Sequence, residues 1–417
     1  MTDVCILGMG YIGLPTAVML AESGCRVLGV DTNPLVREAL GRGEPHIEEP
    51  GLRDRLKAVV AAGTLRAAET PAPADVFIIA VPTPLTADKR ADMRHVAAAA
   101  EALTPFLRAG SLVILESTSP PGTCAELLRP ILEAGGRRVG EDVFLAHCPE
   151  RVLPGRIFEE LVENDRVIGG ADPQAAERAR DLYARFVKGD ILLTDATTAE
   201  MVKLIENTFR DVNIALANET AVLCEAMGID FWSVMRLANR HPRVGLHRAG
   251  PGVGGHCISV DPWFLVERFS GSTPLIALAR RVNDAMPAHV ADRVMAMLAG
   301  VPQPIVALFG LAYKGDVDDL RESPSLALAR LLGERGCEVR AHDPLAQRAP
   351  LPNLSPEACL DGADLLLVAT AHSAFAELDP ADAAARMRGR RVYDAHRLLP
   401  AGRWVDAGFT VEVLGVG

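Results

Sequence analysis

Residues 4–31 read VCILGMGYIGLPTAVMLAESGCRVLGVD. The apolar run VCIL predicts a buried strand, the glycine-bearing stretch after it predicts a tight turn, and the apolar segment through Leu20 to about Ser23 predicts a helix. A second apolar strand, RVLGVD, ends at Asp31. A strand, a helix and a strand within about 30 residues form a βαβ unit, which predicts a parallel sheet.

The rest of the chain continues this alternation, with one interruption. Apolar strands are predicted at 75–81, 111–117 and 142–148, and an Ala-rich helix at 96–107. Helical periodicity then runs from about Thr197 to Gly228, and a Pro-rich break at 301–304 precedes a second strand, helix, strand series at 304–311, 325–336 and 337–344. We therefore expect an α/β protein with two Rossmann-like doubly wound domains (1–196 and 301–417) joined by a helical middle domain (197–300).

Composition excludes several classes of protein. The 417 residues include 43 Lys and Arg against 54 Asp and Glu, so the formal net charge of −11 argues against a nucleic-acid binder. No apolar run approaches the roughly 18 to 20 residues needed to cross a bilayer, and the N-terminus lacks the basic region of a secretory signal. We expect a soluble, cytoplasmic protein that binds neither nucleic acid nor membrane.

The eight cysteines are scattered and form no C-x-x-C pair. This pattern fits neither a zinc module nor a disulfide framework, so the sequence predicts no metal site. Most of these cysteines are expected to be small buried hydrophobic residues.

The turn after the first strand carries G-x-G-x-x-G at Gly8, Gly10 and Gly13. Such glycines allow a tight turn, close approach of a pyrophosphate and close helix packing, while the helix N-terminus offers N–H groups and a positive dipole. Asp31 follows Gly10 by 21 residues, where a carboxylate accepts hydrogen bonds from the adenine-ribose hydroxyls. An NADP enzyme would need a cation next to this acid for the 2′-phosphate, whereas this chain has Thr32 there. NAD is therefore favoured over NADP.

A second glycine-rich loop, GPGVGGHCISVDPWF at 250–264, places Cys257 among four glycines, with Asp261 four residues later. A thiol beside a nicotinamide site attacks an aldehyde to give a thiohemiacetal, which yields a thioester on loss of a hydride. Asp261 is placed to activate the water that releases a carboxylate. We predict that Cys257 is a nucleophile, although most cysteines are simply buried.

The helix predicted at 199–219 carries Lys203 and Asn207 one turn apart. Together they can polarise a substrate hydroxyl or stabilise an oxyanion, although a polar stripe is more often a solvated face. Leu204, Ile205, Phe209, Val212 and Leu216 are expected to fill the opposite side of this helix.

Three loops follow predicted strands, and ligands of open α/β sheets bind beyond the carboxyl ends of strands. VPTP offers Thr83, ESTSPPGT offers Thr118, and CPERVLPG offers Glu150. The threonines are placed for a nicotinamide ring or reacting carbon, and Glu150 for a water or a ribose hydroxyl. Ordinary turn chemistry is the alternative for each loop alone.

These segments, together with YKGDVDDLRESP at 313–324, follow the order found in the UDP-glucose/GDP-mannose dehydrogenase family, which the chain resembles nearly end to end. The resemblance implies an N-terminal NAD domain, a helical middle that forms a homodimer, and a C-terminal domain for the UDP portion. It also implies an enzyme that oxidises C6 of a UDP-sugar twice, consumes two NAD⁺ and serves polysaccharide biosynthesis.

The resemblance also implies roles for individual residues. Cys257 is the nucleophile, Lys203, Asn207 and Asp261 assist proton transfer, oxyanion stabilisation and hydrolysis, and Thr118 and Glu150 organise the acceptor water. The implied cofactor contacts are Gly8, Gly10, Tyr11, Ile12, Gly13, Asp31, Thr83, Thr118 and Arg321. The implied substrate contacts are Glu150, Arg151, Lys203, Asn207, Arg243, Gly254 and Lys314, with Arg243 reaching across the dimer in some relatives.

Two positions narrow the implied substrate. The UDP-glucose branch commonly has Ser before the nucleophile and Lys before the aspartate, whereas this chain has His256 and Val260. That difference favours a UDP-N-acetylhexosamine, with UDP-N-acetyl-D-mannosamine oxidised to the uronate as the best fit. The alternatives are UDP-N-acetylglucosamine or UDP-glucose as substrate, a catalytically silent nucleotide-sugar or NAD binder, and a two-electron dehydrogenase or epimerase.

Overall fold

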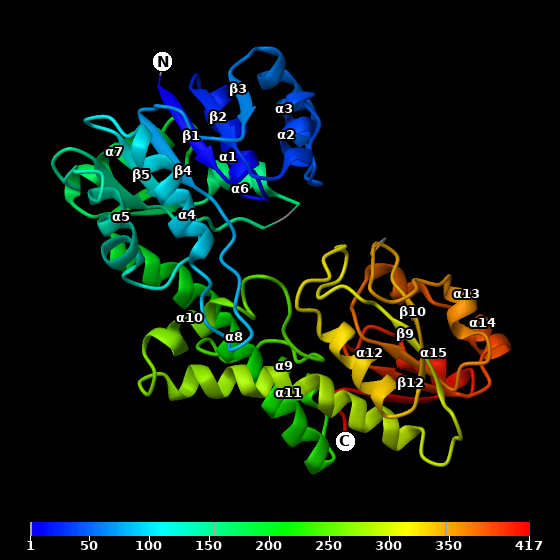
Figure 1. Cartoon of the computed structure of the whole chain (residues 1–417). Coiled ribbons are helices and arrows are strands. Elements are labelled where there is room, and N and C mark those ends of the chain that lie inside the picture. The colour runs from blue at the N-terminus through cyan, green and yellow to red at the C-terminus, as the bar shows by residue number, and fades with distance from the viewer. Residues whose placement is uncertain (1, 154, 347) are drawn as a thin grey trace. The chain divides into compact units, whose positions relative to one another are not determined.

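The structure is a computed structural model that describes residues 2–153, 155–346 and 348–417. These residues form two compact units. The first holds the chain up to Glu206 together with Trp263–Ser270, and the second holds Asn207–Pro262 and Gly271–Gly417. Figure 1 follows the chain through each of them. The three domains predicted at 1–196, 197–300 and 301–417 stay a prediction.

An eight-stranded sheet forms the centre of the first unit, in the order β3-β2-β1-β4-β5-β6-β7-β8. Neighbouring strands are parallel except β6 and β7, which are antiparallel. The strands are β1 (Asp3–Leu7), β2 (Arg26–Val30), β3 (Leu65–Ala68), β4 (Val76–Ile79), β5 (Leu112–Leu115), β6 (Phe144–His147), β7 (Arg166–Gly170) and β8 (Ile191–Asp195). The predicted parallel sheet is confirmed, and the antiparallel pair is an addition to it.

Helices cover both faces of this sheet. They are α1 (Gly13–Glu22), α2 (Pro34–Gly41), α3 (Leu52–Ala61), α4 (Arg94–Leu103), α5 (Arg129–Glu133), α6 (Ile157–Glu163) and α7 (Pro173–Tyr183), with a 3₁₀ turn at Thr104–Phe106 and a π-helical turn at Cys124–Leu128. Successive side chains of β1 point to opposite faces: Val4 and Ile6 join the core under α1, while Cys5 and Leu7 join the core under α4. Each face is therefore buried, as a parallel sheet requires.

The turn between β1 and α1 depends on glycine at two positions. Gly8 has φ +94°, and a Cβ there would lie 2.5 Å from the carbonyl oxygen of Ala80. A Cβ on Gly13 would lie 1.9 Å from the carbonyl oxygen of Gly8. By contrast, a Cβ on Gly10 would meet no described atom within 4 Å. Gly8 and Gly13 thus close the turn, whereas Gly10 borders open space at the start of α1.

The second unit contains a five-stranded parallel sheet in the order β10-β9-β11-β12-β13. Its strands are β9 (Ile305–Phe309), β10 (Glu338–His342), β11 (Leu365–Val368), β12 (Arg391–Asp394) and β13 (Thr410–Val413). Its helices are α9 (Phe231–Ala238), α11 (Pro274–Met297), α12 (Pro324–Glu334), α13 (Pro356–Leu360), α14 (Pro380–Arg386) and α15 (Ala401–Asp406), with a 3₁₀ turn at Ser373–Glu377. Two further helices, α8 (Ala196–Met227) and α10 (Asp261–Arg268), contain residues of both units.

One face of the second sheet packs against helices of the middle region. Leu365 and Leu367 of β11 share a core with Phe231 of α9, Val290 of α11 and Leu328 of α12. Leu366 and Val368 point the other way, into the core that holds Phe309 and Trp404. The predicted fold class, two parallel α/β sheets with a helical middle region, is confirmed.

In the described part of the chain, every helix is too short or too polar to traverse a bilayer.

The close approach at Gly13 leads to a stability prediction. Gly13→Ala should lower the free energy of unfolding by roughly 3 kcal/mol, because the methyl group overlaps a backbone oxygen that cannot rotate away. Thermal unfolding measures the effect. Gly10→Ala is the matched control, since its methyl group enters open space and should shift the melting temperature far less. Equal shifts in both variants would contradict this explanation.

Candidate active site

The first glycine loop presents the N-terminus of α1 beside the carboxylate of Asp31. Each oxygen of Asp31 accepts one backbone N–H, from Met9 at 3.0 Å and from Asn33 at 2.9 Å. These bonds fix the carboxylate at the end of β2 and leave lone pairs for further donors. With the open space at Gly10, the residues fit a dinucleotide: N–H groups for a pyrophosphate and a fixed acceptor for ribose hydroxyls.

The other predicted cofactor residues of the first unit lie at the ends of its elements. Tyr11 is 40% exposed and Ile12 half-buried in the loop that opens α1. Thr83 is buried in the loop that follows β4, and Thr118 is half-buried in the loop that follows β5. Thr83 and Thr118 therefore follow adjacent strands of the sheet, since β4 pairs with β5.

A buried charged cluster holds Glu150. Arg166, at the start of β7, donates to Glu150 at 2.9 Å and lies 4.0 Å from Glu116, and the hydroxyl of Tyr183 donates to Glu116 at 2.6 Å. All four side chains are buried. Burial raises the pKa of Glu116 to about 7, an effect that Arg166 opposes and Glu150 reinforces. The single positive charge of Arg166 lies near two carboxyl groups, Glu116 and Glu150. A proton on Glu116 leaves one negative charge, on Glu150, to balance that of Arg166.

Arg151 and Lys203 complete the predicted residues of the first unit. The guanidinium of Arg151 binds Glu206 with N···O distances of 2.6 and 3.1 Å and donates to the Asp165 carbonyl at 2.9 Å. Arg151 is thus engaged by protein groups, and its contact with substrate stays a prediction. Lys203 is half-buried on α8.

The second unit holds the predicted nucleophile and its neighbours. Cys257 is exposed, and its carbonyl oxygen accepts from the N–H of Asp261 at 2.9 Å, at the beginning of α10. The Asn207 amide donates to the Asp261 carboxylate at 2.5 Å, and Arg210 donates to the Asn207 oxygen. Asn207 and Asp261 are 1% and 3% exposed. The structure therefore brings Asn207 and Asp261 together, with the orientation of the Asn207 amide set by Arg210.

Hydrogen bonds anchor the second glycine loop. The Gly250 N–H donates to Asn218 at 2.9 Å, Asn218 donates to Asn283 at 2.9 Å, and Asn283 donates to Asp211 at 2.8 Å. Arg280 closes the chain by donating to Asp211 at 2.6 Å. These four polar side chains are buried, so breaking one link leaves a buried group unsatisfied.

Glycine is required where this loop passes other parts of the second unit. A Cβ on Gly254 would lie 2.5 Å from the Glu322 carbonyl oxygen, and a Cβ on Gly255 would lie 2.9 Å from the ring of Tyr313. Packing alone thus accounts for Gly254, which was predicted to contact substrate. That contact stays a prediction.

The predicted cations of the second unit lie at its surface. Lys314 and Arg243 are exposed, and Arg321 forms a two-pronged ion pair with Asp319, at 2.9 and 2.6 Å. Burial and the positive charge of Arg321 lower the pKa of His256, the residue before Cys257. Asp319 thus holds the guanidinium of Arg321 in a fixed position.

The predicted site residues divide between the two units. Thr118, Glu150 and Lys203 belong to the first unit, and Asn207, Cys257 and Asp261 belong to the second. Glu116, Arg166 and Tyr183, which form the buried cluster with Glu150, were not predicted from the sequence. A signal did exist for Arg166, because it is a charged residue that opens the apolar strand sequence RVIGG.

The fold and the two glycine-rich loops together define an NAD-dependent dehydrogenase. Comparisons with known proteins identify its family. Three models of the UDP-glucose/GDP-mannose dehydrogenase family match: the NAD binding domain at residues 2–187, the central domain at 197–285 and the UDP binding domain at 307–401. The chain belongs to the UDP-glucose/GDP-mannose dehydrogenase family.

Individual relatives are similar over their full lengths. A UDP-N-acetyl-D-mannosamine dehydrogenase of Methanococcus maripaludis is 44% identical over 99% of this chain and 97% of its own. An NDP-N-acetyl-D-galactosaminuronic acid dehydrogenase of Ralstonia nicotianae is 44% identical over 96% of this chain and 97% of its own. The solved structure of a UDP-D-ManNAc dehydrogenase from Pyrococcus horikoshii is 42% identical, with a TM-score of 0.93 and coverage of 100% of this chain and 99% of that one.

The raised pKa of Glu116 leads to a prediction about pH. The folded chain keeps this proton where the unfolded chain, with a carboxyl pKa of 4.5, has lost it. Glu116 therefore makes the free energy of unfolding fall as the pH rises from about 4.5 to about 7, by about 3 kcal/mol in total. Glu116→Gln should flatten that part of the stability curve measured by urea unfolding.

Glu177→Gln is the control for this prediction, because Glu177 is an exposed carboxylate of the same unit. Its stability curve should keep the slope of the parent protein. If the Glu116→Gln curve also runs parallel to the parent curve, Glu116 does not hold the extra proton.

Proposed function

We propose that this chain oxidises C6 of a UDP-N-acetylhexosamine twice with NAD⁺, and that the substrate is UDP-N-acetyl-D-mannosamine, which becomes UDP-N-acetyl-D-mannosaminuronate. The observation that carries the proposal is the exposed thiol of Cys257 on the glycine loop, one turn before a buried Asp261 that Asn207 holds. A two-electron dehydrogenase or an epimerase has no need of such a thiol.

The names of similar proteins support the choice of substrate. Relatives from Methanococcus maripaludis and Pyrococcus horikoshii are UDP-N-acetyl-D-mannosamine dehydrogenases, and both match this chain nearly end to end. By the family resemblance, His256 before Cys257 and Val260 before Asp261 also favour an N-acetylhexosamine over glucose. The relative from Ralstonia nicotianae acts on an N-acetylgalactosamine derivative by its name, so the hexosamine epimers are the substrates to compare.

The proposed reaction begins with loss of a proton and a hydride from the C6 alcohol, which gives an aldehyde. Lys203 takes the hydroxyl proton or stabilises the oxyanion that forms, and Asn207 donates to the same substrate oxygen. The Cys257 sulfur then bonds to the aldehyde carbon, and its proton passes to the oxygen, which forms a thiohemiacetal. Loss of a second hydride from that carbon and of the proton from its hydroxyl group gives a thioester.

Hydrolysis completes the proposed scheme. Water adds to the thioester carbon, the carbon–sulfur bond breaks, and the thiol of Cys257 re-forms as the carboxylate leaves. Asp261 acts as the base for this water, while Thr118 and Glu150 orient it. The loop of Gly8, Gly10 and Gly13 would hold NAD⁺, which would supply the hydride acceptor, so one alcohol, one water and two NAD⁺ would yield one carboxylate, two NADH and three protons.

The proposal assigns the remaining predicted residues to the two ligands. Gly8, Gly10, Tyr11, Ile12, Gly13, Asp31, Thr83 and Arg321 serve NAD, and Arg151, Arg243, Gly254 and Lys314 serve the UDP-sugar. We assign the UDP portion to residues 301–417, where the family's UDP binding domain matches at 307–401. A catalytic thiol must stay reduced, which favours the cytoplasm as the location of the enzyme.

The stoichiometry of NADH tests the proposal. A limiting, known amount of UDP-N-acetyl-D-mannosamine with excess NAD⁺ should yield about two NADH per sugar, measured by ultraviolet absorbance, because a thioester connects two hydride transfers. About one NADH would contradict the thioester scheme. If UDP-N-acetyl-D-mannosamine yields no NADH, the other candidate substrates are UDP-N-acetylglucosamine, UDP-N-acetylgalactosamine and UDP-glucose. Formation of NADH from one of them would identify that sugar as the substrate. Failure of all four would favour a silent binder.

Cys257→Ser separates chemistry from binding in the same assay. The serine variant should lose formation of the acid and keep NAD binding, measured by fluorescence titration, since Cys257 and the glycine loop of Gly8, Gly10 and Gly13 belong to different units. Cys224→Ser is the control, because Cys224 is a buried core residue of the second unit. Full activity of Cys257→Ser would defeat the mechanism.

We also propose that the enzyme is a homodimer joined through α8. Phe209, Leu216 and Leu223 are spaced by seven residues on this helix and are 62%, 56% and 56% exposed. Heptad spacing puts them on one stripe, and a symmetric dimer would bury that stripe against its copy. Phe209 and Leu216 were expected on the apolar side of this helix, opposite Lys203 and Asn207. A partner chain would supply the burial that the single chain does not.

Leu216→Glu tests the dimer. A charge in the stripe should shift the mass measured by light scattering toward that of the monomer, because a buried unpaired carboxylate costs several kcal/mol. Val405→Glu is the matched control, since Val405 lies in the same unit with the same exposure of 56%. An unchanged mass for Leu216→Glu would exclude this surface.

A further inference from the structure

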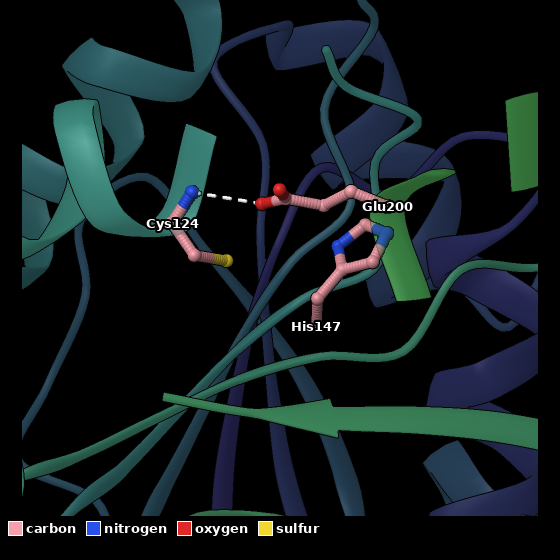
Figure 2. Close-up of side chains that lie close together, drawn as sticks. All are labelled: Cys124, His147 and Glu200. Atoms are coloured by element: carbon pink, nitrogen blue, oxygen red, sulfur yellow. Dashed lines mark hydrogen bonds between the residues drawn. The ribbon is translucent and has the colours of Figure 1, made fainter. Parts of the chain in front are cut away.

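Cys124, His147 and Glu200 meet inside the first unit, although they are far apart in the sequence. Cys124 begins a π-helical turn, His147 ends β6, and Glu200 lies on α8. One ligand atom from each, a sulfur, a ring nitrogen and a carboxylate oxygen, lies within 4.8 Å of the others. Figure 2 shows the three side chains directed toward one another. All three residues are buried.

His147 is the unusual member of this group. Its side chain is 0% exposed, and neither ring nitrogen has a hydrogen-bond partner among the described residues. Buried polar atoms in proteins are nearly always satisfied, because an unsatisfied one costs about 1–3 kcal/mol. Burial also lowers the pKa of His147 to about 3, which keeps the ring neutral with a lone pair free to bind. One ring nitrogen therefore faces Cys124 and Glu200 without a hydrogen bond to either of them.

Glu200 is oriented toward the same space by backbone groups. One carboxylate oxygen accepts the N–H of Cys124 at 2.8 Å, and the other accepts the N–H of Gly122 at 2.5 Å. Each oxygen keeps a lone pair beyond these bonds. Burial and the nearby carboxylate of Glu200 raise the pKa of the Cys124 thiol, so the thiol keeps its proton unless a cation replaces it.

We propose that Cys124, His147 and Glu200 bind one Zn²⁺ ion. Sulfur, imidazole nitrogen and carboxylate oxygen are the three ligand types that zinc takes in proteins, and three protein ligands leave a fourth position for water. On binding, the S–H bond of Cys124 breaks, a sulfur–zinc bond forms and the proton goes to solvent, with no change of oxidation state. A thiolate and a carboxylate then neutralise the charge of the ion within the buried site.

The position of this site connects it with predicted catalytic residues of the same unit. Glu200 lies one turn before Lys203 on α8, and Gly122 and Cys124 close the loop that carries Thr118. A bound ion would tie this loop, β6 and α8 together. Zinc would therefore stabilise the first unit and fix the segments that carry Thr118 and Lys203. The proposal does not depend on the substrate.

Direct measurement of zinc tests the proposal. The untagged Cys257→Ser variant, which lacks the exposed thiol, is stripped with a chelator, incubated with Zn²⁺, desalted and analysed by mass spectrometry for metal. About one zinc per chain should remain, and the melting temperature should rise. With Co²⁺ in place of Zn²⁺, the thiolate-to-cobalt absorption band should appear.

Two variants in that background identify the ligands. Cys124→Ser should lose the cobalt–thiolate band and at least tenfold in zinc affinity, and His147→Gln should lose zinc retention while keeping its circular dichroism spectrum. Cys5→Ser is the matched control, because Cys5 is a fully buried thiol of the same unit and should retain both signals.

Two outcomes would overturn the proposal. Zinc retention unchanged in Cys124→Ser and His147→Gln would place the metal elsewhere. A parent protein without retained zinc and without the cobalt–thiolate band would show that the cluster binds no metal, and this result needs no variant to fold. The contact would then be a thiol that donates to the carboxylate of Glu200.

Discussion

The first unit depends on the contact between two glycines, where the backbone turns from β1 into α1. A Cβ on Gly13 would lie 1.9 Å from the carbonyl oxygen of Gly8, so the helix can approach the strand only because Gly13 has no side chain. This close packing aims the N-terminus of α1 at the space beside Gly10. The same turn brings the Met9 N–H to Asp31, so the geometry of the cofactor loop and of the sheet are set together.

Elsewhere, polar side chains are positioned by partners that are themselves fixed. In the second unit, Arg210 orients Asn207, which holds Asp261 at the start of α10. In the first unit, Arg166 holds Glu150 beneath the end of β6. Each arrangement restricts a flexible side chain by hydrogen bonds before any ligand arrives, so less conformational entropy would be lost on binding.

The sequence predicted those features whose signal is local. The glycines at 8, 10 and 13, the acid at Asp31 and the thiol at Cys257 stand within short stretches whose pattern requires them. The apolar strands that end before Thr83, Thr118 and Glu150 were also predicted from short local stretches of sequence. Two parallel sheets followed from this alternation, and the family models confirm the assignment.

Contacts between residues that are far apart in the sequence were not predicted. Glu116 meets Arg166 and Tyr183 only because β5, β6 and β7 are neighbours in the sheet. Cys124 and Glu200 come together where the π-helical turn meets α8, and no spacing rule links them. The apolar stripe of α8 illustrates a different limit, because periodicity identifies Phe209 and Leu216 as one face but does not say what covers it.

Each unit is built from segments that are not continuous in the sequence, which limits how related chains can be recombined, in evolution or by engineering. The chain passes between units after Glu206, after Pro262 and after Ser270, and the first two of these points lie inside α8 and α10. If two related genes recombined at a position that encodes a loop, the product would therefore not receive a complete unit from either parent. Lys203 and Asn207, four residues apart, would have to be inherited as a single block, so chimaeras of relatives should be joined outside these two helices.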